Sequence, residues 1–118
     1  MEKEIHIIKS SITKQELKQI AKETFGDLVK AVVDLEQGIM ALGGELHADE
    51  EVVLMEQEGS KRENTWGINL LPEKSEDAFI QFDSMINLKP AFGNSSRTVE
   101  DKDIQRKIKV LVMKLIKE

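Results

Sequence analysis

Residues 79–97 read FIQFDSMINLKPAFGNSSR, and this amphipathic stretch decides how the second half of the chain is expected to fold. From Ile80 onward the side chains divide between two faces, because successive residues of a β-strand point to opposite sides. The apolar face holds Ile80, Phe82, Ile86 and Leu88, and the polar face holds Gln81, Asp83, Asn87 and Lys89. The pattern predicts a strand over residues 78–89, whose polar face is the first candidate for a functional surface.

A second strand is predicted over residues 66–71, just before Pro72, and it should pair with the first. Residues 68–72 read INLLP and residues 86–90 read INLKP. If both segments are strands of one sheet with aligned apolar faces, Asn69 and Asn87 project to the same side. The alternative is two ordinary strands that each end at a proline.

The beginning of the chain predicts a short strand over residues 5–8, followed by a helix from Lys14 to about Gly26. Thr13 and Glu16 have the spacing of a capping box, in which two side chains satisfy the first free amides of a helix. Gly26 is a suitable residue to end the helix, because glycine readily adopts a left-handed conformation.

The sequence pattern in the middle of the chain fits more than one secondary structure. Residues 28–42 fit either a continued helix or a hairpin that turns at residues 36–38. Three valines favour strands, so the hairpin is the preferred interpretation. The acidic residues 49–51 come directly before an apolar run, which predicts a helix that closes at Gly59.

The last helix has the clearest pattern in the chain. Its apolar stripe consists of Ile104, Ile108, Leu111, Val112, Leu115 and Ile116. Thr98 and Asp101 are spaced as a second capping box, and acids at the start with lysines at the end suit the helix dipole. Together the patterns predict an α+β fold with element order β-α-β-β-α-β-β-α. We expect a largely antiparallel sheet packed against helices, with the long C-terminal helix covering its apolar face.

Composition limits the class of protein. A chain of 118 residues without cysteine fits a single domain, spanning residues 1–118, that folds without disulfides or thiolate metal sites. Neither a signal peptide nor a membrane span is expected, which predicts a cytoplasmic protein. The net charge of −5 argues against broad affinity for nucleic acid.

A metal site is one chemical hypothesis. Glu45, His47 and Asp49 would share one face if residues 43–51 were a strand, and an imidazole with carboxylates can hold a divalent cation. The competing interpretation is that Asp49 simply belongs to the acidic first turn of a helix.

The turn at residues 93–97 offers amides, hydroxyls and a guanidinium, a set that can hold a phosphate or carboxylate. The favoured alternative is a structural turn in which Arg97 pairs with Asp83 or with a helix acid. Ser84 is in phase with the apolar strand face, so a buried hydroxyl is expected there. Trp66 is the single tryptophan, and packing in the core is its default role.

Four strings in the chain, GGELHADE from residue 43, WGINL from residue 66, FDSMIN from residue 82 and NSSR from residue 94, resemble a small family of uncharacterised prokaryotic proteins. The family is a domain of unknown function, and the similarity covers nearly the whole chain. The resemblance implies a compact single domain and supplies no catalytic residue.

The sequence favours a small noncatalytic module that binds a ligand or a protein partner and needs no cofactor. The residues expected to form its site are His47, Trp66, Asn69, Asp83, Asn87, Lys89 and Arg97. Their asparagines would form hydrogen bonds and their basic groups would meet an anion. The alternatives are a metal-dependent hydrolase or nuclease using His47, Asp49 and Asp83, and burial of the polar face against a second copy of the chain.

Overall fold

The computed structural model describes residues 4–118, apart from the side chain of Glu76. Its strands are β1 (His6–Ile8), β2 (Ile12–Thr13), β3 (Val29–Asp34), β4 (Ile39–Leu42), β5 (Thr65–Leu70), β6 (Ile80–Gln81) and β7 (Ile116–Lys117). The α-helices are α1 (Lys14–Glu23), α2 (His47–Glu58) and α3 (Lys102–Leu115). Short 3-10 helices are η1 (Arg62–Asn64), η2 (Glu76–Phe79), η3 (Met85–Asn87) and η4 (Pro90–Phe92). The predicted α+β class is confirmed.

The main sheet is antiparallel, with strand order β1-β4-β3-β5-β6. The hairpin interpretation of residues 28–42 is confirmed, because β3 and β4 pair in register from Ala31 opposite Leu42 to Asp34 opposite Ile39. The turn between them is held by Asp34, whose Oδ1 accepts hydrogen bonds from the amides of Glu36 and Gln37 at 2.9 and 3.2 Å. Among residues 4–118, no helix is long and apolar enough to cross a bilayer.

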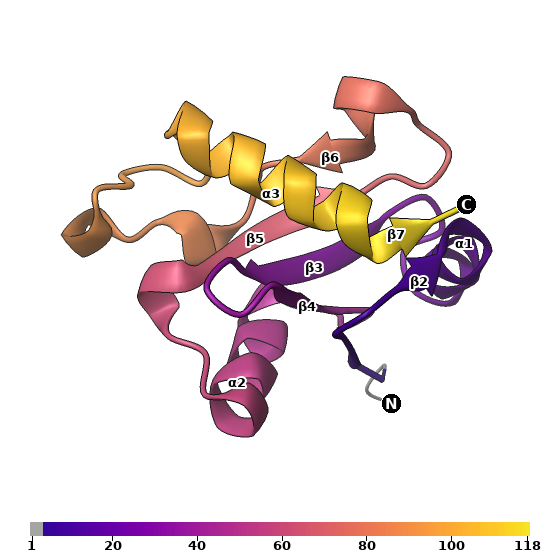
Figure 1. The fold of residues 1–118 in the computed structure, drawn as a ribbon, viewed down its shortest axis with the longest axis horizontal. Coiled ribbons are helices and arrows are strands. Elements are labelled where there is room, and N and C mark those ends of the chain that lie inside the picture. The colour runs from indigo at the N-terminus through magenta and orange to yellow at the C-terminus, as the bar shows by residue number, and fades with distance from the viewer. Residues whose placement is uncertain (1–3) are drawn as a thin grey trace.

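The two faces of this sheet are covered by different helices (Figure 1). Leu17 of α1 and Ile108 of α3 join Val33 of β3 in the larger apolar cluster. On the opposite face, Leu54 of α2 packs with Val32 of β3 and Ile86 of η3. Since neighbouring residues of a strand point to opposite sides, β3 contributes to both clusters and lies at the centre of the molecule.

The last helix begins where its acidic cap predicts. Asp101 is the N-cap, and its carboxylate accepts hydrogen bonds from the amides of Asp103 and Ile104. The predicted capping box with Thr98 is therefore replaced by a cap on Asp101 alone. The helix ends in β7, which pairs in parallel with β2 through Ile12 and Ile116, a pairing that was not predicted.

The predicted strand over residues 78–89 is wrong except at β6 (Ile80–Gln81), because residues 78–79 belong to η2 and residues 85–87 form η3. Within this segment only β6 pairs with β5, and the chain then turns through η3. The physical reason is local, because the Ser84 hydroxyl accepts a hydrogen bond from the Ile86 amide at 3.2 Å and starts the turn. Gly67 of β5 leaves room for it, since a Cβ there would lie 2.5 Å from Ser84 Cβ.

Candidate ligand-binding site

A surface depression of about 430 Å³ lies where the start of α2, the loop after β6 and one end of the sheet meet. We call it the polar depression. Its lining residues are Leu28, Lys30, Leu46, His47, Ala48, Asn69, Gln81, Asp83, Ser84, Met85, Ile86 and Arg97. Four of the seven residues predicted for the site, namely His47, Asn69, Asp83 and Arg97, are among them.

The sheet register explains how the floor of the polar depression is assembled. Asn69 of β5 lies opposite Lys30 of β3 on one side and opposite Gln81 of β6 on the other. Gln81 was placed on the candidate polar face but left out of the predicted site residues, and Lys30 was not predicted at all. A detectable signal existed for Lys30, because it is the single charged residue inside the run Val29-Lys30-Ala31-Val32-Val33.

Asn69 carries the most informative atom of the polar depression. Its side chain is only 8 % exposed, and its Nδ2 donates a hydrogen bond to the Asp83 carbonyl at 3.2 Å. Its Oδ1 has no hydrogen-bond partner among the described residues. An unpaired buried acceptor of this kind costs about 1–3 kcal/mol, so a donor that reaches this atom would recover part of that free energy.

His47 is the first residue of α2, and its side chain contacts β5, where Nε2 lies 2.8 Å from the Ile68 carbonyl oxygen. Because a carbonyl only accepts, Nε2 carries the proton and donates it. Burial lowers the pKa of His47, and Lys30 adds to this effect, whereas the Ile68 carbonyl, Asn69 and Asp83 oppose it. The ring is therefore neutral at pH 7, and its Nδ1 is a second acceptor.

The rim of the polar depression carries an ion pair. Arg97 Nε lies 3.1 Å from Asp83 Oδ1, and both side chains are more than half exposed. The loop that presents Arg97 is held by Asn94, whose Nδ2 donates to the carbonyls of Asn87, Ser96 and Thr98. The predicted structural turn, with Arg97 paired to Asp83, is confirmed.

Asn87 lies outside the polar depression, in the interior. Its Oδ1 accepts from the Gly67 amide at 2.8 Å, while its Nδ2 donates to the Gly67 carbonyl and to the Arg97 carbonyl, each at 3.0 Å. The carboxamide thus takes the place of a peptide group from a neighbouring strand, beside the part of β5 that β6 does not reach. The expected alignment of Asn87 with Asn69 on one polar strand face is wrong.

Lys89 and Trp66 are also buried. Lys89 Nζ donates to the carbonyls of Arg62 and Thr65 at 2.6 and 2.5 Å and lies 3.8 Å from the centroid of the Trp66 ring. Burial lowers the pKa of Lys89 to about 8, with a further contribution from the charge of Arg62. The ammonium therefore binds backbone carbonyls next to β5 and does not line the polar depression.

The proposed metal ligands do not assemble. His47 and Asp49 lie in α2 rather than on a strand, because the acidic run 49–51 belongs to the first turns of that helix. Among residues 4–118, no three His, Cys, Asp or Glu side chains are placed to hold a metal ion. The predicted face shared by Glu45, His47 and Asp49 is therefore wrong.

Glu50 of α2 is the second buried side chain that keeps an unpaired oxygen within the described residues. Its Oε2 accepts from the Gly44 amide at 2.9 Å, and burial raises its pKa well above the ordinary value. Glu50 does not line the polar depression. Its contacts with the backbone of Gly44 make it a structural group at the start of α2.

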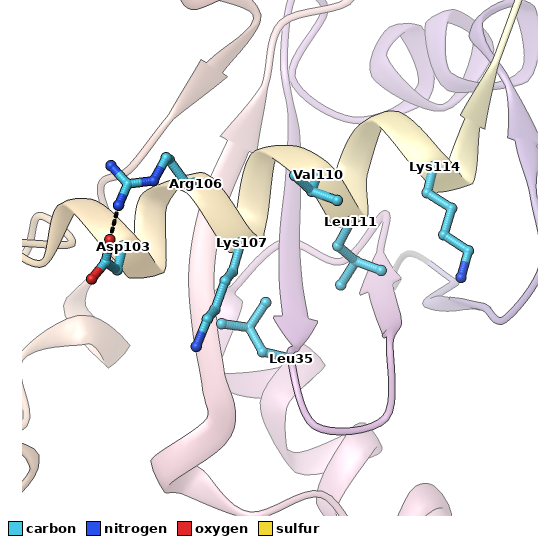
Figure 2. A pocket seen from close by; sticks show the side chains of 7 residues that line it. All are labelled: Leu35, Asp103, Arg106, Lys107, Val110, Leu111 and Lys114. Atoms are coloured by element: carbon cyan, nitrogen blue, oxygen red, sulfur yellow. Dashed lines mark ion pairs between the residues drawn. The ribbon is translucent and has the colours of Figure 1, made fainter.

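A larger hollow of about 600 Å³ lies along α3 (Figure 2). We call it the α3 groove. It is lined by Leu35, Asp103, Arg106, Lys107, Val110, Leu111 and Lys114. Its polar groups are the charged side chains of Asp103, Arg106, Lys107 and Lys114, and Arg106 pairs with Asp103. The α3 groove therefore lacks the buried, directional hydrogen-bonding atoms that distinguish the polar depression.

Comparison with known proteins gives a family and no activity. Residues 6–115 match the family described as Protein of unknown function (DUF5674), so the chain belongs to that family. The resemblance to a domain of unknown function is confirmed at this level, while a prokaryotic origin stays a prediction. No curated protein and no solved structure matches the chain.

Proposed function

We propose that this member of the DUF5674 family is a noncatalytic binding module, which receives a small neutral amide in the polar depression. The observation that carries the proposal is the unpaired, buried Oδ1 of Asn69. A ligand N–H that donates a hydrogen bond to this oxygen would remove the free-energy cost of leaving it unpaired. Nδ1 of the neutral His47 ring offers a second acceptor nearby.

Two of the three charged residues that line the polar depression, Lys30, Asp83 and Arg97, pair with each other, which weakens its attraction for a charged ligand. Arg97 and Asp83 already pair with each other, so an added anion or cation has to compete with that pair. Lys30 can donate to a ligand carbonyl, and Gln81 can donate or accept. An amide presents one donor and one acceptor in a fixed geometry, which matches this mixture of groups.

The local chemistry supports binding better than hydrolysis. The Ser84 hydroxyl is buried beneath Gly67 and is engaged with the Ile86 amide, so it is poorly placed to act as a nucleophile. His47 uses one ring nitrogen to contact the Ile68 carbonyl. A metal-dependent reaction would need a shared site for His47, Asp49 and Asp83, which the described residues do not form.

The test is an amide NMR titration of the full chain with N-acetylglycinamide. We expect saturable shifts at Asn69, His47 and residues 81–84, and their loss in Asn69→Ala. Asn64→Ala, at the end of η1 just before β5, is the matched control and should bind like the wild type, because Asn64 does not line the polar depression. Shifts in response to Mg²⁺, Mn²⁺ or Zn²⁺ alone, centred on His47 and Asp83, would instead support the hydrolase. Absence of any response to the amide would reject the proposal.

A further inference from the structure

A second hollow of about 440 Å³ adjoins the polar depression. We call it the Phe25 hollow. It is lined by Thr24, Phe25, Lys30, Glu45 and Leu46. Lys30 and Leu46 line both hollows, so the two spaces meet at these side chains. A ligand bound in the polar depression can extend over them without crossing the folded core.

Two large apolar side chains are exposed in the walls of the Phe25 hollow. Phe25 is 43 % exposed and Leu46 is 55 % exposed. Lys30 Nζ lies 5.0 Å from the centroid of the Phe25 ring, and Lys30 lines both hollows. Glu45 also lines the hollow, and its carboxylate disfavours an anionic group there. The space suits an uncharged apolar substituent.

Leu46 is an unusual residue for its position. It is the N-cap of α2, with φ −132° and ψ 136°, and its side chain makes no capping hydrogen bond. Ser, Asp and Asn are strongly preferred at this position because their side chains satisfy a free amide of the first turn. A leucine at this position makes no capping hydrogen bond, and its exposed apolar side chain is in contact with water. Departures of this kind from local preference tend to mark functional sites.

We infer that the ligand is peptide-like: its amide occupies the polar depression, and an apolar side chain of about the size of leucine occupies the Phe25 hollow. The inference rests on the proposed function and adds the identity of the group attached to the amide. An extended peptide advances by only 3.3–3.6 Å per residue, so an amide and its own side chain suit two hollows that share a wall. Contact of that side chain with Phe25 and Leu46 would strengthen binding through burial of apolar surface.

The test compares two probes, N-acetylleucinamide and N-acetylglycinamide, by amide NMR titration of the full chain. We expect the leucine probe to bind about tenfold more tightly and to shift the amides of Phe25 and Leu46, which the glycine probe leaves unchanged. In Leu46→Ser and Phe25→Ser the two affinities should become equal. Leu46→Ser restores a capping residue, so its melting temperature should rise, which separates lost binding from lost folding.

Two exposed residues of the same types provide matched controls. Leu88 is 41 % exposed and Phe92 is 50 % exposed, and neither lines the two hollows. Leu88→Ser and Phe92→Ser should keep the tenfold preference. Equal affinity of the wild type for both probes would overturn the inference and leave the proposed function standing. If neither probe binds, both the proposed function and this inference are rejected.

Discussion

At the scale of single residues, two asparagines in the same local sequence have opposite environments. Asn69 and Asn87 each follow isoleucine and precede leucine, yet one lines the polar depression and the other is fully buried against Gly67. Local sequence cannot separate them, because the difference depends on where β6 stops. The sequence could therefore indicate His47, Asn69, Asp83 and Arg97 as neighbours, but it could not remove Asn87 from the same set.

Asn87→Ala should destabilise the protein rather than act on binding alone. The substitution leaves the amide and carbonyl of Gly67, together with the carbonyl of Arg97, without their side-chain partner. Since each buried unpaired group costs about 1–3 kcal/mol, we expect a loss of about 3 kcal/mol or more. Urea denaturation measures it. Asn69→Ala removes a single hydrogen bond but also removes the unpaired Oδ1, so the two effects offset each other and we expect little change in stability; equal losses for the two variants would contradict this assignment.

The single tryptophan should report the ionisation of Lys89. The ammonium lies 3.8 Å from the centroid of the Trp66 ring, and its pKa is lowered to about 8. Raising the pH through this value removes the charge in the folded state, so Trp66 fluorescence should change with a midpoint near pH 8. Lys30→Met should retain the transition and Lys89→Met should lose it. A transition that survives in Lys89→Met would assign it to another group.

The free energy of unfolding should also depend on the ionisation of Lys89, and the direction of this dependence can be predicted. The pKa of Lys89 is lower in the folded protein than its ordinary value of 10.5, so the unfolded chain binds more protons between pH 8 and 10.5. The contribution of Lys89 to the free energy of unfolding therefore rises with pH across that window and is lost as pH falls through about 8. Urea denaturation of the wild type and Lys89→Met at several pH values measures this contribution.

At the scale of elements, strong periodicity was a better guide than alternation over a short run. The stripe along α3 and the capping box at α1 were predicted and are present. Residues 78–89 also alternate, but Ser84 and Gly67 fit together so closely that a turn replaces the strand. This contact joins residues far apart in sequence, so no local pattern contains it. The two-residue strands β2 and β7 escaped prediction for the same reason.

Gly67→Ala tests the close contact between β5 and the turn. The added methyl group would lie 2.5 Å from Ser84 Cβ and 2.6 Å from Ser84 Oγ, so the turn has to move away from the strand. Overpacking of this kind typically costs about 1–3 kcal/mol. We expect a lower melting temperature and altered amide shifts at residues 84–87. An unchanged melting temperature would mean that the turn does not pack closely against Gly67.

At the scale of the whole molecule, the sheet divides the protein into a stable centre and a less stable edge. β3 pairs with β4 along one side and with β5 along the other, and it contributes to both apolar clusters. β6 forms only two residue pairs with β5. The polar depression is therefore built with its floor on central strands and its rim on the edge.

Native-state hydrogen exchange should reveal this division. Amides of β3 should exchange only through global unfolding, whereas those of residues 80–98 should exchange through local opening at a lower free energy. N-acetylglycinamide should slow exchange in residues 80–98 and leave β3 unchanged if the depression binds it. Uniform protection throughout the chain would contradict a separate edge.

The most direct test of the central claim is a crystal structure of the protein soaked with N-acetylglycinamide. The account predicts a ligand nitrogen about 2.7–3.2 Å from Asn69 Oδ1, with the carboxamide of Asn87 still bound to Gly67. If Asn69 Oδ1 is instead hydrogen-bonded within the protein and the amide is absent from the polar depression, the claim that this atom awaits a ligand is wrong.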